Sequence, residues 1–315
     1  MTLIARLKST TAATARGLVA AAIGFGLAFT VMAPPADAFA GSIQPAADAG
    51  PALWVVRDSD STLYLFGSVH VLRPTTDWAS RRVDAAFDSA DEVWFEVTNP
   101  DDQAAALPLI QRHGLSLDRP LSSRLTAEEM AELETAARTA GMTADQLEPM
   151  RPWLAALSLS MAPLVKAGFD PKSGVELVLR ARAEAVGKPV KGLETLGQQV
   201  GLLASLSEEA EMAFLRSALE TFEEASERLD GLVDAWADGD VETVESLGVD
   251  EIREDSEEVY QIMLARRNAD WARQIETLLE GSGTAFIAVG AAHLAGPDSV
   301  QALLEREGVR VERVD

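Results

Sequence analysis

Residues 62–70 read TLYLFGSVH, an apolar run that ends in a Gly-x-x-His motif, and residues 284–293 read TAFIAVGAAH, which ends in the same way. Each run is typical of a buried β-strand. Glycine lets the chain turn sharply after the strand, so the histidine is expected to point back over the strand end. One such motif means little, but two copies at strand ends indicate a site. A pair of hydrogen-bonded structural histidines is the alternative.

Other strands are predicted near both ends of the chain. Residues 53–57 and 62–66 flank a turn-forming run, 92–97 read as a buried strand, and 309–314 alternate as a last strand. A short strand is expected at 188–193, within a region from about 101 to 280 that is mainly helical. We therefore predict an α/β fold, whose sheet is built from both ends of the mature chain and capped by a largely helical central region.

Apolar residues at helical spacing predict helices between these strands. Residues 126–129, Thr-Ala-Glu-Glu, form a capping box. Pro297 suits the first position of the last helix, and Gly308 is placed to end it. The expected helices include 77–90, 152–166, 173–186, 207–236, 251–279 and 297–307.

The first 40 residues have the pattern of a secretory signal peptide. Positive charges precede an apolar stretch at 18–32, and Ala-x-Ala sites for cleavage follow at 36–38 and 38–40. The alternative is an uncleaved anchor, but the stretch is shorter than the ~20 residues that span a membrane. We predict a signal peptide at 1–40, a short linker at 41–50 and one domain at 51–315. The expected location is periplasmic or secreted, with no stable membrane insertion after cleavage.

Composition excludes several functions. The chain contains no cysteine, so thiolate metal sites, iron–sulfur clusters and cysteine nucleophiles are ruled out. Its formal net charge is −23, which argues against nucleic acid and anionic membrane surfaces as partners. Solubility alone also explains this acidity.

Glu96 is a third candidate for the site, because it follows apolar residues at the end of the strand at 92–97. A buried carboxylate is costly unless it is paired or bound to metal. Ligand crevices of open α/β sheets lie outside the carboxyl ends of the strands. If these strands are parallel neighbours, His70, Glu96 and His293 meet there, and they suit a divalent metal that activates water. A salt bridge at the sheet rim is the alternative for Glu96.

Arg267 falls on the inward face of the helix predicted at 251–279, with Asn268 beside it. An inward arginine needs an anion, and Glu96 and Glu194 are the candidate partners. Arg267 could hold Glu96 or stabilise an oxyanion, or its side chain could extend to the helix edge. Glu194 is either an acidic group in the crevice or the cap of the next helix, and we favour the cap. The apolar stripe that defines this face is Tyr260, Leu264, Trp271, Ile275 and Leu278.

Together these motifs resemble the TraB/PrgY/GumN family over essentially the whole mature chain. The segments that carry the resemblance follow in order: 63–70 (LYLFGSVH), Glu96, 187–195 (GKPVKGLET) with Gln198, Arg267-Asn268 with Trp271, and 288–296 (AVGAAHLAG). The family is linked to TIKI-type metalloproteases, in which paired Gly-x-x-His motifs and a glutamate bind a divalent metal. The resemblance implies the same role for His70, Glu96 and His293, and supporting roles for Arg267 and Asn268.

We therefore expect an extracytoplasmic metal-dependent hydrolase, a peptidase, that uses Mn, Co or Zn. Its substrate would be a peptide or another small extracytoplasmic molecule. Arg267 or Asn268 would stabilise the oxyanion, and a second carboxylate, for which Glu194 is the candidate, would move the proton. The alternative is a non-catalytic protein that binds a peptide or pheromone, or an accessory protein related to polysaccharide. His113, the third histidine, is expected only to end a helix.

Overall fold

The computed structural model describes residues 50–98 and 102–314. The predicted signal peptide at 1–40 and nearly all of the linker lie outside these ranges, so both stay predictions. Within the described ranges, none of the helices combines the length and the apolarity that crossing a membrane requires.

A mixed sheet of six strands forms the centre of the described chain, in the order β4-β3-β5-β2-β1-β6. Strands β2, β3, β4 and β5 run parallel, while β1 is antiparallel to both β2 and β6. The predicted α/β fold with a sheet from both chain ends is confirmed, and the strand near 190 supplies one edge. The strands are β1 (Leu53–Arg57), β2 (Ser61–Ser68), β3 (Glu92–Val97), β4 (Val190–Glu194), β5 (Gly283–Gly290) and β6 (Val311–Arg313).

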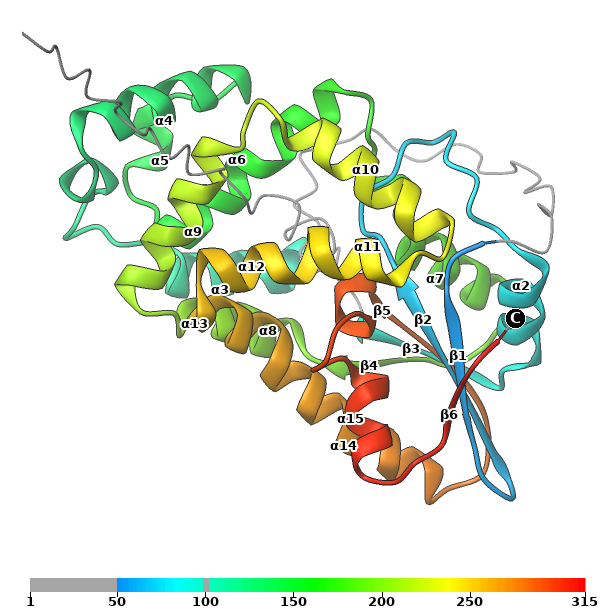
Figure 1. Cartoon of the computed structure of the whole chain (residues 1–315). Coiled ribbons are helices and arrows are strands. Elements are labelled where there is room, and N and C mark those ends of the chain that lie inside the picture. The colour runs from blue at the N-terminus through cyan, green and yellow to red at the C-terminus, as the bar shows by residue number, and fades with distance from the viewer. Residues whose placement is uncertain (1–49, 99–101, 315) are drawn as a thin grey trace, which may run out of the picture.

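Helices cover both faces of the sheet and form a separate group beside it (Figure 1). The α-helices are α2 (Arg81–Ser89), α3 (Gln103–His113), α4 (Ala127–Thr139), α5 (Ala144–Leu147), α6 (Pro152–Lys166), α7 (Val175–Ala185), α8 (Leu196–Ala204), α9 (Glu208–Glu220), α10 (Ala225–Ala237), α11 (Val241–Glu245), α12 (Glu251–Asp255), α13 (Glu257–Tyr260), α14 (Arg266–Leu279) and α15 (Val300–Arg306).

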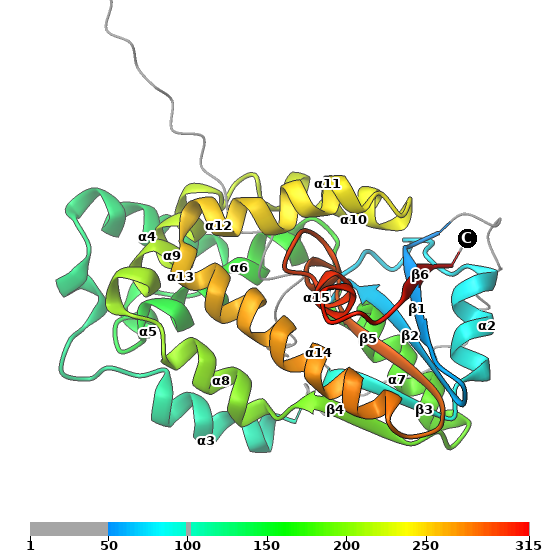
Figure 2. The ribbon, with the colours of Figure 1, turned by 60° about the horizontal axis from the view of Figure 1, so that its bottom comes forward.

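Alternating side chains of the central strands point to two different cores. Leu65 and Ile287 pack with Trp271 on the face covered by α14 and α15. Phe66 and Phe286 belong to the core on the opposite face, which α2 and α7 cover. Figure 2 shows α14 and α15 in front of the sheet, with α7 behind it. Because both faces are buried, the strands read as nearly continuous apolar runs.

Two long predicted helices are broken in the structure. The helix expected at 207–236 stops at Glu220 and restarts at Ala225. The helix expected at 251–279 is interrupted at Ser256, whose extended backbone (φ −161°) lets its side chain cap α13 by accepting from the amide of Val259. Serine favours such caps over helix interiors. A π-helical turn, Gln261–Ala265, then leads into α14.

Other helix starts were placed too early. The helix expected from residue 77 begins at Arg81, because the side chain of Ser80 caps it. The assignment of Pro297 to the first helical position is wrong, since α15 begins at Val300 with Ser299 at the N-cap position. By contrast, the capping box of Thr126 and Glu129 is confirmed at the start of α4.

Candidate functional site

The parallel register brings the ends of four strands to one edge of the sheet. Ser68 at the end of β2 pairs with Gly290 at the end of β5, and Phe95 of β3 pairs with Ala288 of β5. Glu194, the last residue of β4, pairs with Val97 of β3. The polar side chains that follow these strands therefore face a common region, as the sheet-edge argument predicts.

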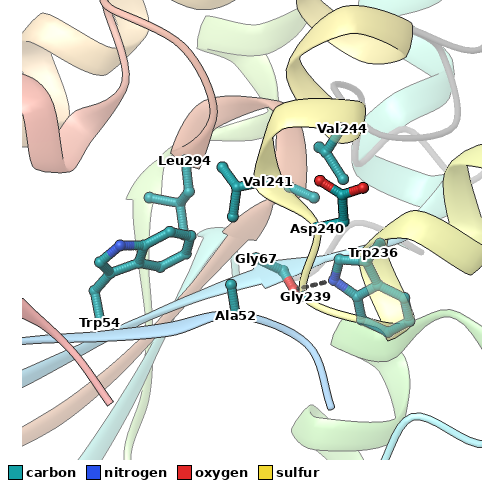
Figure 3. A pocket seen from close by; sticks show the side chains of 10 residues that line it. Ala52, Trp54, Gly67, Trp236, Gly239, Asp240, Val241, Val244 and Leu294 are labelled. Carbon is teal, nitrogen blue, oxygen red and sulfur yellow. Dashed lines mark hydrogen bonds between the residues drawn. The ribbon is translucent and has the colours of Figure 1, made fainter. Parts of the chain in front are cut away.

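The glycines of the two Gly-x-x-His motifs allow these turns to pack closely. A Cβ atom on Gly67 would lie 3.2 Å from the Cα atom of Ala291, so a larger residue would push the motifs apart. Gly290 contributes its amide, which donates to Glu96 Oε1 at 2.8 Å. Trp236 donates to the Gly67 carbonyl at 2.7 Å, beside a small apolar pocket that also includes Leu294 (Figure 3).

Two histidines and one carboxylate converge at this edge. Glu96 Oε1 lies 4.0 Å from His70 Nε2 and 3.8 Å from His293 Nε2. Glu96 and His293 are almost completely buried, at 2% and 0% exposure. The three side chains singled out by the sequence therefore do come together, and their role as metal ligands stays a prediction.

The other oxygen of Glu96 is held by protein donors. Glu96 Oε2 accepts from Arg267 Nη2 at 2.6 Å and from Gln199 Nε2 at 3.2 Å. This arrangement fixes the carboxylate plane, because each oxygen has its own set of partners. Oε1 is left facing the two imidazoles.

Arg267 is buried between the two carboxylates that were its candidate partners. Its Nε and Nη2 donate to Glu194, and its Nη2 also donates to Glu96. Its Nη1 lies 3.0 Å from the Met263 carbonyl and 3.1 Å from His293 Nε2. Burial lowers the pKa of Arg267, but the two carboxylates outweigh this effect and raise it. The alternative of an arginine that extends to the helix edge is therefore wrong.

Glu194 contacts Arg267 and Trp271 rather than capping a helix. Its carboxylate accepts from Arg267 and from Trp271 Nε1, the latter at 3.1 Å. Thr195 caps α8 instead, in a capping box with Gln198. The cap reading of Glu194 is thus wrong. The side chain is an acidic group of the site, and its catalytic role remains a prediction.

Asn268 fixes the ring of His293. Asn268 Nδ2 donates to the Asp298 carbonyl at 2.8 Å, so its Oδ1 faces His293 Nδ1 at 2.5 Å. His293 must then carry its proton on Nδ1 and present a lone pair on Nε2. Burial, together with the positive charge of Arg267, lowers the pKa of His293 well below its ordinary value. His293 is therefore neutral and suited to bind a cation.

His70 has a different partner. Its Nδ1 lies 2.6 Å from Glu176 Oε1, and Ser68 Oγ donates to the same carboxylate. Burial lowers the pKa of His70, but the charge of Glu176 outweighs this and raises it. Glu176 shows the reverse: burial raises its pKa, and the contact with His70 lowers it overall. His70 Nε2, on the side of Glu96, is buried without a hydrogen-bond partner among the described residues.

Glu176 and Gln199 were not anticipated as members of the site. Both lie on helices whose local pattern shows only ordinary amphipathic spacing, and tertiary packing alone brings them to the sheet edge. A glycine, Gly174, stands two residues before Glu176, and a Cβ atom on it would lie 2.1 Å from the His70 carbonyl. Glycine at that position is therefore required by contact with the first Gly-x-x-His motif. His113, as expected, ends α3.

The donor set fits a divalent cation in chemistry and nearly in spacing. No three His, Cys, Asp or Glu side chains stand ready to coordinate an ion in residues 50–98 and 102–314. The Nε2–Oε1 separations of 3.8 and 4.0 Å are close to the widest that one ion spans with bonds of ~2.0–2.2 Å. The unpartnered, buried His70 Nε2 is the atom that most needs such a ligand.

Comparisons with known proteins identify the family of the chain. The profile of the TraB/PrgY/gumN family matches residues 52–313. A similar protein, "Uncharacterized protein" of Treponema pallidum (strain Nichols), is 23% identical over 261 residues, which cover 78% of each chain. "Uncharacterized protein YbaP" of Escherichia coli (strain K12) is 22% identical over 256 residues, covering 81% of this chain and 92% of the relative. No solved structure matches. Because the family profile spans nearly the whole described chain, the chain belongs to the TraB/PrgY/gumN family.

Proposed function

We propose that the protein is an extracytoplasmic metal-dependent hydrolase that acts on peptides. The observation that carries this proposal is the convergence of His70 Nε2, His293 Nε2 and Glu96 Oε1. Two imidazoles and a carboxylate are a common donor set for Zn²⁺, Mn²⁺ or Co²⁺. Such an ion would act as a Lewis acid toward a carbonyl and would lower the pKa of water.

The surrounding side chains hold these donors in place. Arg267 neutralises Glu96 and Glu194, which would otherwise repel each other in a buried region. Asn268 uses both ends of its amide, one on His293 and one on the Asp298 carbonyl. These contacts support positioning roles for both residues. Stabilisation of an oxyanion by either one would require it to give up a contact.

Export is the second part of the proposal. It rests on the positively charged start, the apolar stretch at 18–32 and the Ala-x-Ala sites before residue 41. Substrates would then be peptides or other small molecules outside the cytoplasm. The helices beside the sheet in Figure 1 would shape the approach to the site.

One observation favours a second candidate, a metal-free protein that binds peptides without cleaving them. Arg267 Nη1 lies 3.1 Å from His293 Nε2 and so competes for the lone pair that an ion would use. In this case the site would be complete without metal, and Arg267 would supply the buried positive charge between Glu96 and Glu194. Peptide binding would then be independent of chelators.

The two candidates are separated by turnover of a peptide library. The mature protein is stripped with a chelator and supplied in turn with Mn²⁺, Co²⁺ and Zn²⁺. The proposal expects cleavage that returns with metal and disappears in His70→Ala. His113→Ala is the matched control, because that histidine ends α3 and its carbonyl accepts from Arg151, which is not a residue of the site. Peptide binding without cleavage under every metal would support the second candidate.

A further inference from the structure

The first Gly-x-x-His motif is clamped by the segment that begins α7. The Val175 amide donates to the Val69 carbonyl at 3.0 Å, and the Asp170 amide donates to the Leu72 carbonyl at 2.8 Å. Gly174 lies between these contacts, with no room for a side chain against His70. Backbone hydrogen bonds and this close packing therefore join the loop after β2 and the start of α7 into one unit.

This unit places the Glu176 carboxylate directly behind the His70 ring. Glu176 Oε1 lies 2.6 Å from His70 Nδ1 and also accepts from Ser68 Oγ. The glutamate side chain is only 12% exposed, so water competes little for these contacts. A neutral imidazole in water favours the proton on Nε2, which would point a hydrogen, rather than a lone pair, toward Glu96.

We propose that Glu176 is a positioning residue, which holds the proton of His70 on Nδ1 and so directs the Nε2 lone pair toward Glu96 and His293. The inference deepens the proposed function and rests on it, because the lone pair is useful only to a bound cation. An acceptor behind the ring of a histidine ligand also makes the ligand a stronger donor.

The two histidines support this assignment by comparison. Asn268 Oδ1 accepts from His293 Nδ1 at 2.5 Å in the same way that Glu176 accepts from His70. Both rings therefore present Nε2 to Glu96 Oε1. The acceptor is a neutral amide on one side and a carboxylate on the other, so His70 is expected to be the stronger donor of the pair.

The proton position can be measured without metal. With ¹⁵N-labelled histidine only the three histidines of the chain give signals, and their ¹⁵N shifts distinguish the two neutral forms. At a pH at which all rings are neutral, we expect Nδ1–H for His70 in the wild type and in Glu176→Gln, whose amide oxygen still accepts. Glu176→Met removes the acceptor, and Nε2–H should then dominate. Retention of Nδ1–H in Glu176→Met would overturn the inference.

Zn²⁺ titration of the same variants gives a second measurement. Loss of a contact behind a metal ligand weakens affinity by about tenfold to a hundredfold. We expect Kd to rise in the order wild type, Glu176→Gln, Glu176→Met. Glu211→Gln is the control, since Glu211 is a buried carboxylate that pairs with Arg151 away from the site. Glu211→Gln should lower the melting temperature without changing the Zn²⁺ affinity.

The two proposals fail in different ways. Suppose that the wild type binds no divalent metal, while His70 carries Nδ1–H in the wild type and Nε2–H in Glu176→Met. The metal centre is then wrong, and the positioning role of Glu176 stands. If Zn²⁺ binds with equal affinity to the wild type and to Glu176→Met, the positioning role is wrong. Should Glu176→Met fail to fold, Zn²⁺ titration of Glu176→Gln still tests the positioning role, because this variant is expected to bind more weakly than the wild type and equal affinity would overturn the inference.

Discussion

Replacing Arg267 by lysine tests the electrostatic organisation of the site. Arg267 is 3% exposed, and its guanidinium donates to Glu96, Glu194 and the Met263 carbonyl. Lysine carries the same charge but offers a compact ammonium group rather than a planar fork. We expect it to pair with one carboxylate, because it lacks the fork with which Arg267 spans Glu96 and Glu194.

The magnitude follows from the contacts that are lost. A hydrogen bond to a charged group contributes about 1.5–3 kcal/mol. Arg267→Lys gives up the contacts to one carboxylate, so we expect a loss of about 3 kcal/mol in the free energy of unfolding. Arg267→Ala leaves Glu96 and Glu194 buried together without a cation, and removal of one partner from a buried ion pair costs about 3–5 kcal/mol.

Urea denaturation with a constant m-value measures both losses. Arg266→Lys is the control, because Arg266 is the exposed neighbour on the same helix, and it should change stability by less than about 0.5 kcal/mol. If Arg267→Lys is as stable as Arg266→Lys, the planar fork of Arg267 contributes nothing that a lysine ammonium group cannot supply, and the account of Arg267 is refuted.

Three further predictions concern the frame of the site, an ion pair beside it and the chain start. Gly174→Ala would place Cβ 2.1 Å from the His70 carbonyl. We therefore expect the free energy of unfolding, measured with urea, to fall by at least about 1–3 kcal/mol. In the control Gly187→Ala the added Cβ meets no atom within 4 Å, so only backbone strain should lower the stability. The Tyr260 hydroxyl donates to Asp298 and is the main cause of the lowered pKa of that carboxyl. The stability that this contact contributes is present above the ordinary pKa of 3.8 and is lost as the pH falls through the lower pKa of the folded state. The difference in free energy of unfolding between the wild type and Tyr260→Phe should therefore be largest at neutral pH and should shrink below about pH 4. Amino-terminal sequencing of the protein from the cell envelope should find a start near residue 39 or 41, and an intact Met1 in the cytoplasm would contradict export.

The strands were accessible from sequence, most clearly the central ones that are buried on both faces, whereas their order in the sheet was not. The ranges 53–57 and 92–97 were predicted to the residue, since a continuous apolar run has clear ends. The same property located the site, because the carboxyl ends of parallel strands share one edge. His70, Glu96 and His293 could therefore be placed together before their contacts were known.

The contacts behind the ligands could not be predicted in this way. Glu176 and Gln199 reach the site through the packing of α7 and α8 against the sheet, and helical spacing carries no information about which carboxylate meets which histidine. The break at Ser256 was also missed, because one serine in a helical pattern can either point outward or cap a new helix. Tertiary contacts decide between these outcomes.

Divalent metal binding tests the central claim most directly. Isothermal titration of the metal-free mature protein with Zn²⁺, Mn²⁺ and Co²⁺ is carried out beside His293→Ala and Glu96→Gln, with His113→Ala as the control for a histidine outside the site. The account predicts one tight ion per chain in the wild type and in His113→Ala, and a loss of binding in the other two variants. No binding by the folded wild type, or equal binding by His293→Ala and Glu96→Gln, would contradict it.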